Sequence, residues 1–189
     1  MLSNFLIKKF IKNNDDINDN KVRIAYGNLG GAVGIIINTL LFLIKLFVGL
    51  FAGSIAIIAD AFNNLSDAAS SIITIIGFKM ANKPADAEHP FGHGRIEYIS
   101  ALVVSFMVML VGLQFVKTSF QKIITPTPVS FETIPFLLLL ISIGFKLWLS
   151  RFNKSIGNKI NSSTLKATAT DAMGDVFTSS TVVISFLIA

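Results

Sequence analysis

Five long runs of apolar residues limit what this 189-residue chain can fold into. A helix needs about 20 mostly apolar residues to cross the hydrocarbon core of a bilayer. The runs cover about residues 32–52, 54–80, 96–116, 131–149 and 161–189. Charged residues make up only 14% of the chain, whereas a soluble domain carries about 25%. We therefore predict an all-α membrane protein that folds as a helical transmembrane bundle, with the lipid bilayer as a partner.

The composition excludes other classes of site and partner. The chain has no cysteine, so neither a disulfide framework nor a thiolate metal site can form. Any metal site must use oxygen or imidazole ligands, which suit harder ions. The formal net charge is +5, and in a membrane protein the positive-inside rule accounts for such an excess. We expect no nucleic-acid partner and no prosthetic group.

The basic residues predict the orientation of the chain. If the five spans alternate, thirteen lysines and arginines lie on one side and only Lys117 and Lys122 on the other. Lys146 is counted with the basic stretch that follows the fourth span. This bias places the N-terminus in the cytoplasm, and we expect polar linkers over 117–129, with Pro126 and Pro128, and over 151–160.

Two domains are expected along the chain. Residues 1–30 are predicted to be a cytoplasmic tail, and residues 31–189 the transmembrane domain. The phenylalanines and lysines near the N-terminus fit a short interfacial amphipathic helix. They fit a solvated tail equally well.

Carboxylates and amides lie within two of the apolar runs at helical spacing. Asn63 and Asp67 are four residues apart, as are Asp171 and Asp175, and residues at this spacing share a helix face. At 1.5 Å per residue, the three aspartates fall near the midplane of the bilayer, where ionisable groups indicate a functional site. We predict that the two pairs face each other and bind a divalent metal. The alternative is that each polar side chain bonds locally to a neighbouring helix.

Three further polar residues lie close to this face. Asp60 and Asn64 lie beside the face of the first pair, with Asp60 nearer the outside. Asp60 could be an entry ligand, a proton relay or the partner of Lys45, which is costly within the first span unless it pairs or snorkels. We assign all three residues supporting roles.

The polar loop between the second and third spans carries both histidines. Asp86, His89 and His93 have ligand spacing, and they predict a possible second metal site. The alternative is a turn fixed by its proline and glycines, in which the imidazoles bond to the backbone.

Three strings together resemble the cation diffusion facilitator family of divalent-metal/proton antiporters. They are ADAFNNLSD over 59–67, HPFGHGR over 89–95 and TDAMGD over 170–175. The resemblance extends from about Arg23 to the end of the chain. It implies a transport site made of Asn63, Asp67, Asp171 and Asp175, and a loop metal site at Asp86, His89 and His93.

The resemblance also implies the ion and the mechanism. Zinc-type members usually have histidine at the position of Asp171, so the Asn-and-Asp pattern is similar to the manganese-type branch. We expect Mn²⁺ as the transported cation, then Fe²⁺, with Zn²⁺ less favoured. The implied activity is secondary active transport, not catalysis: alternating access that exchanges metal for protons.

The family normally has six spans, a ferredoxin-like cytoplasmic C-terminal domain and a homodimeric assembly. These 189 residues hold five of the expected six spans and not that domain. The expected location is a bacterial cytoplasmic membrane. The alternatives are zinc, cobalt or cadmium efflux by the same fold, a non-transporting fragment, or an intramembrane aspartyl protease, whose Gly-x-Gly-Asp string has only a partial match at 172–175.

Overall fold

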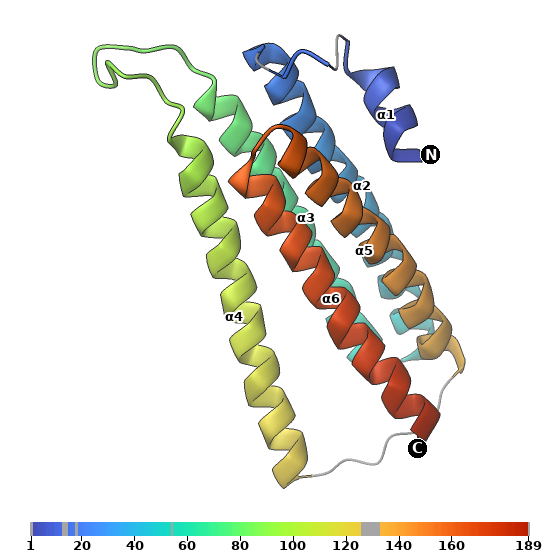
Figure 1. The fold of residues 1–189 in the computed structure, drawn as a ribbon. Helices are drawn as coiled ribbons and strands as arrows, with labels where there is room; N and C mark the ends of the chain where they lie inside the picture. The colour runs from blue at the N-terminus through green and yellow to red at the C-terminus, as the bar shows by residue number, and fades with distance from the viewer. Residues whose placement is uncertain (1, 13–14, 18, 54, 126–132, 189) are drawn as a thin grey trace.

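A bundle of helices makes up the computed structural model, which describes residues 2–12, 15–17, 19–53, 55–125 and 133–188. Within these residues every regular element is a helix, and five long helices lie side by side with a short one beside them (Figure 1). The helices are α1 (Leu2–Phe10), α2 (Asn20–Ala52), α3 (Ile55–Ala81), α4 (Ile96–Ile124), α5 (Thr133–Lys159) and α6 (Ser163–Ile188). The prediction of an all-helical bundle is confirmed.

Three helices within the described residues are both long enough and apolar enough to cross a membrane. They are Asn20–Ala52, Ile96–Gln121 and Thr133–Lys159. The helices α3 and α6 are of similar length but carry the aspartates predicted to bind metal.

Local signals fix the ends of α2. The Asp19 side chain accepts the backbone N–H of Lys21 at 2.9 Å and caps the first turn. At the other end Gly53 adopts the left-handed conformation with φ 63°, and its N–H bonds to the last carbonyls of the helix. The helix therefore begins well before the apolar run at 32–52, because hydrophobicity marks the membrane-buried part and not the whole helix.

Two of the expected linkers are partly helical. The helix α4 continues to Ile124 and α5 continues to Lys159, so the predicted loop over 151–160 is wrong. Lysine and arginine are good helix formers and extend a helix into water as readily as apolar residues do within the bilayer. The rest of the first linker, with Pro126 and Pro128, lies outside the described residues, as do Ser54, 131–132 and Ala189 of the expected spans.

The helices pack in two tight pairs, α2 with α3 and α5 with α6, while α4 lies against α3 and α6. One core cluster lies at the end of the bundle near α1 and includes Tyr26, Phe78 and Phe152. Leu6 and Ile7 of α1 pack against this cluster. The N-terminal segment is therefore a helix with a partly buried face, and Phe5 and Phe10 remain exposed.

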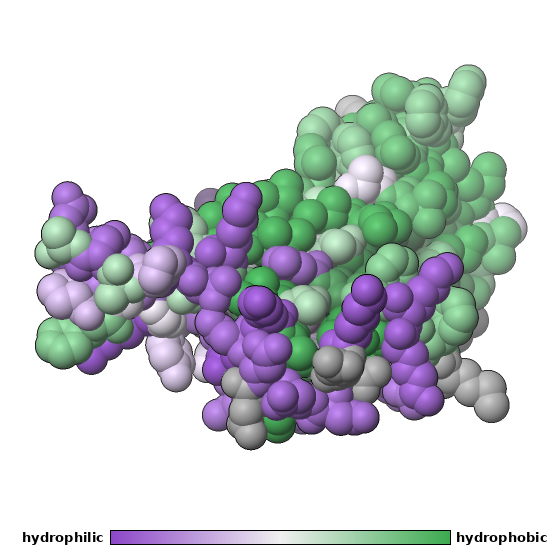
Figure 2. Space-filling model, turned by 90° about the horizontal axis from the view of Figure 1, so that it is seen from above, coloured by the Kyte–Doolittle hydropathy of each residue, from purple (hydrophilic) through white to green (hydrophobic). Residues whose placement is uncertain are grey.

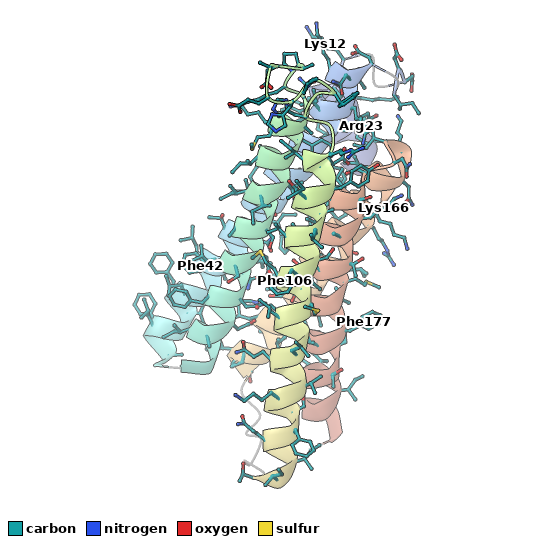
Figure 3. All side chains as sticks on the ribbon, turned by 90° about the vertical axis from the view of Figure 1, so that its left-hand side faces the viewer. Lys12, Arg23, Phe42, Phe106, Lys166 and Phe177 are labelled. Carbon is teal, nitrogen blue, oxygen red and sulfur yellow. The ribbon has the colours of Figure 1, made fainter. Side chains whose placement is uncertain are left out.

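The two ends of the bundle differ in polarity. Seen from the end that carries α1, hydrophilic residues gather on the near surface and hydrophobic residues cover the part beyond (Figure 2). The labelled basic residues Lys12, Arg23 and Lys166 lie at this end, and Phe42, Phe106 and Phe177 lie along the length of the bundle (Figure 3). At the same end Arg23 Nη2 of α2 pairs with Glu97 Oε2 of α4 at 2.6 Å.

Candidate metal centre

The two predicted pairs of polar residues meet between α3 and α6. These helices contact each other over a short stretch only, and Asn63 Nδ2 lies 3.5 Å from Asp175 Oδ1 within it. Asp67 lies one turn along α3 from Asn63, and Asp171 one turn along α6 from Asp175. The structure thus brings together all four residues that the sequence singled out.

A fifth residue, Lys146 of α5, lies at the centre of this group. Its Nζ atom is 2.5 Å from Asp67 Oδ2 and 2.5 Å from Asp175 Oδ2. Its side chain is 4% exposed, so the prediction that Lys146 belongs to a basic segment outside the membrane is wrong. The sequence did contain the signal: a lysine about 20 Å into a helix is an intramembrane charge that needs a partner.

The charges of the centre sum to a value that suits a divalent ion. Asp67, Asp171 and Asp175 interact electrostatically with one another and with Lys146. Three ionised carboxylates and one ammonium give a formal charge of −2. Among the described residues no hydrogen bond holds the Asp171 carboxyl, whereas the other two carboxyls bond to Lys146. The centre therefore has oxygen atoms to offer and negative charge left to neutralise.

Asn63 needs a change of orientation to act as a ligand. In the structure its amide nitrogen faces Asp175, whereas a cation would bind the amide oxygen. A half-turn of the amide about its last bond exchanges these two atoms without moving the helix. With that change the donor set is one amide and three carboxylates, which suits a hard or borderline ion such as Mn²⁺.

A cavity of about 520 Å³ leads from this centre along the bundle, away from the end that carries α1. Asn63, Lys146 and Asp175 line its inner part, and Asp60 and Lys45 line it further out. Ser70, Ser71 and Thr74, which follow Asp67 along α3 in the opposite direction, are buried.

The supporting residues take specific positions at this cavity. Lys45 Nζ pairs with Asp60 Oδ2 at 2.8 Å, and the Lys45 side chain is 5% exposed while that of Asp60 is 44% exposed. The predicted partnership between them is therefore present. Asn64 Nδ2 donates to the Asp60 carbonyl at 3.0 Å, so Asn64 bonds along its own helix, and it lines the same cavity as Asn63.

The loop between α3 and α4 gathers Asp86, His89 and His93. One potential ligand atom from each lies within 4.8 Å of the others. Asp86 Oδ1 also accepts the backbone N–H of His89 at 2.7 Å, and this hydrogen bond lowers the pKa of Asp86. His93 Nδ1 lies 3.2 Å from the Pro84 carbonyl, which leaves Nε2 directed toward Asp86. The loop thus has the bonds of a fixed turn together with a cluster of potential ligands.

A bundle of apolar helices around a buried acidic centre is the architecture of a membrane protein that handles cations. The sequence profile of the cation efflux transmembrane domain matches residues 32–189 of the chain. The chain therefore belongs to the cation diffusion facilitator family of cation efflux transporters, and it is an integral membrane protein. Membership in a transport family removes the basis for an intramembrane aspartyl protease.

Relatives of known name support the same assignment. The chain is 34% identical over 153 residues to the manganese efflux system protein MneS of Bacillus subtilis, covering 81% of the chain and 53% of MneS. It is 33% identical over 162 residues to the magnetosome protein MamM of Paramagnetospirillum magneticum, covering 83% of the chain and 50% of MamM.

A third relative is the cation-efflux pump FieF of Citrobacter koseri, 29% identical over 168 residues, which are 87% of the chain and 56% of FieF. The chain spans about half the length of the curated relatives it matches.

Proposed function

We propose that the complete protein exports a divalent metal cation, with Mn²⁺ favoured and Fe²⁺ next. The observation that carries this proposal is the buried centre of Asn63, Asp67, Asp171 and Asp175. Its donors are oxygens, and with Lys146 its formal charge of −2 matches one divalent cation. The name of MneS, a manganese efflux protein, supports the same ion. Zinc would gain less here, because the centre offers no imidazole.

Transport is proposed to proceed by alternating access in exchange for protons. The cavity beside the centre supports one of the two access states, since it reaches Asn63 and Asp175 from a single direction. Metal ligands must be deprotonated, so protons arriving from outside would displace the cation from the carboxylates and then return inward. Asn63 cannot titrate and would contribute to ion selection alone.

The N-terminus is proposed to be cytoplasmic and the membrane that of a bacterial cell. The basic residues at the α1 end of the bundle support this orientation. A homodimer is proposed for the complete protein. The loop residues Asp86, His89 and His93 are proposed to hold a second metal ion on the cytoplasmic side.

The test is transport by the complete protein in proteoliposomes. We expect Mn²⁺ addition to drive proton flux in the wild type and the response to Fe²⁺, Co²⁺ and Zn²⁺ to be weaker. Asp171→Ala and Asp175→Ala are each expected to abolish the flux, while Lys154→Met, at an exposed position of α5, leaves it unchanged. Flux that survives both aspartate substitutions would rule out the proposed site.

A further inference from the structure

Lys146 occupies the position in the centre that a bound cation would need. Its ammonium lies at 2.5 Å from one carboxylate oxygen of α3 and 2.5 Å from one of α6. A cation that bridges Asp67 and Asp175 must bind these same carboxylates from between the two helices. An ammonium and a metal ion cannot both lie within bonding distance of the same pair of oxygens, because their positive charges repel strongly at such separations.

Ser142 offers the Lys146 ammonium an alternative hydrogen-bond partner. Ser142 lies one helical turn before Lys146 on α5, is 3% exposed and has a hydroxyl without a hydrogen-bond partner in the described chain. Both residues line the cavity beside the centre. Helical side chains lean toward the N-terminus of their helix, which for Lys146 is the direction of Ser142. A rotation of the lysine side chain would bring its ammonium to that hydroxyl.

We propose that Lys146 is a built-in competitor of the transported cation: its ammonium holds Asp67 and Asp175 when no metal is bound and moves outward to Ser142 when a divalent ion enters. This inference rests on the proposed function of the centre. It makes Lys146 a residue that sets ion affinity without being a ligand. It also means that α3 and α6 remain joined in both states, first through the ammonium and then through the ion.

A competitor and a purely structural lysine predict opposite effects of substitution. Removing the ammonium in Lys146→Met deletes the competitor, so Mn²⁺ should bind at least tenfold more tightly. Lys146→Arg keeps the charge and supplies a planar fork that matches two carboxylates better than an ammonium does, so Mn²⁺ should bind at least tenfold more weakly. A structural lysine would give weaker binding in both variants.

The measurement is Mn²⁺ titration calorimetry on the complete protein in lipid nanodiscs, together with thermal melting with and without Mn²⁺. Lys154→Met is the matched control, since it removes one exposed lysine from the same helix and should behave as the wild type. Without Mn²⁺, Lys146→Met should melt at a lower temperature than the wild type, and saturating Mn²⁺ should close that gap, because an ion that binds only the folded state stabilises it. An equal gap in both conditions would contradict the inference.

One further variant separates failure of the proposed centre from failure of the competitor role. Asp171→Asn, which leaves the bonds of Lys146 in place, should abolish binding if the proposed centre is correct. If Asp171→Asn binds Mn²⁺ as the wild type does, the centre itself is wrong. If Asp171→Asn loses binding but Lys146→Met gains none, the centre stands and the competitor role is wrong.

The remaining outcomes concern folding and the destination of the lysine. If Lys146→Met is recovered as a folded protein only in the presence of Mn²⁺, the inference is supported. If it does not fold in either condition, Lys146→Arg decides, and wild-type affinity in that variant overturns the inference. Ser142→Ala should weaken Mn²⁺ binding about threefold and leave melting without Mn²⁺ unchanged, and wild-type affinity there would exclude Ser142 as the destination.

Discussion

The contact between α2 and α3 allows a prediction about a residue that is not itself an ion ligand. Gly31 of α2 lies so close to α3 that a methyl group on it would be 2.4 Å from Ile75 Cγ1 and 3.1 Å from the Ser71 carbonyl. Carbon atoms in contact are normally about 3.5–4.0 Å apart. The substitution Gly31→Ala therefore requires α3 or the Ile75 side chain to move by about 1 Å or more.

The energy of this change has two opposing parts. Overpacking of this kind costs about 1–3 kcal/mol, whereas replacing glycine by alanine within a helix gains about 1 kcal/mol. Gly112→Ala isolates the gain in helix propensity, because nothing lies within 4 Å of the methyl group that it adds to α4. The two variants share the gain in helix propensity, so their difference in stability should be about 1–3 kcal/mol, with Gly31→Ala the less stable.

The displacement should reach the metal centre through Ser71. Its hydroxyl donates to the Asp67 carbonyl at 3.0 Å, so a shift of this turn of α3 moves Asp67 relative to Asp175. Ligand distances in metal sites are held to about 0.2 Å, and we expect Gly31→Ala to weaken Mn²⁺ binding about tenfold or more, equivalent to about 1.4 kcal/mol.

The assay is thermal melting and Mn²⁺ titration of both variants in nanodiscs. Equal stability and equal Mn²⁺ affinity of Gly31→Ala and Gly112→Ala would refute the reasoning, since it would mean that α3 is not held in place by its close approach to α2.

Three more predictions concern ionisable groups outside the centre. Asp60→Asn should destabilise the protein by about 2–3 kcal/mol because it leaves the buried Lys45 ammonium unpaired. Adding Lys45→Met to this variant should restore most of the lost stability. If melting experiments show that the losses of the two single variants add up in the double variant, the pairing is contradicted. His93→Ala should reduce the number of bound metal ions per chain from two to one in equilibrium dialysis, and an unchanged number would exclude the loop site. The hydrogen bond from the backbone N–H of His89 lowers the pKa of Asp86. The ionised Asp86 carboxylate therefore stabilises the loop fully at a pH above the ordinary aspartate pKa of about 3.9, and this stabilisation is lost as the pH falls through the lower folded-state pKa. Asp86→Asn should therefore increase hydrogen exchange at the His89 amide at neutral pH and not in strong acid, and an equal effect at both would refute this account.

The sequence predicts the fold well because the bilayer leaves few choices. An apolar run of about 20 residues in lipid has to satisfy its backbone within itself, and a helix does so. Each predicted span accordingly overlaps one long helix of the structure over most of its length. The ends of α4 and α5 were not predictable in the same way, because outside the bilayer a polar helix and a polar loop have similar compositions.

The candidate site was predictable as far as helical spacing and depth determine it. Spacing puts Asn63 with Asp67 and Asp171 with Asp175, and depth puts the two pairs at one level. Lys146 was counted among the residues outside the membrane because the positive-inside rule counts charges along the sequence, whereas the partners of this lysine come from α3 and α6. Only the packing of three helices shows that its ammonium lies between two carboxylates.

The central claim is that Asn63, Asp67, Asp171 and Asp175 hold the transported cation. The most direct measurement is electron cryo-microscopy of the complete protein in nanodiscs, with and without Mn²⁺. With Mn²⁺ we expect density for one ion between α3 and α6, within about 2.6 Å of oxygen atoms from the three carboxylates, and a Lys146 side chain that has moved away from Asp67 and Asp175. Mn²⁺ density confined to the loop of Asp86, His89 and His93, with Lys146 still between the two carboxylates, would contradict it.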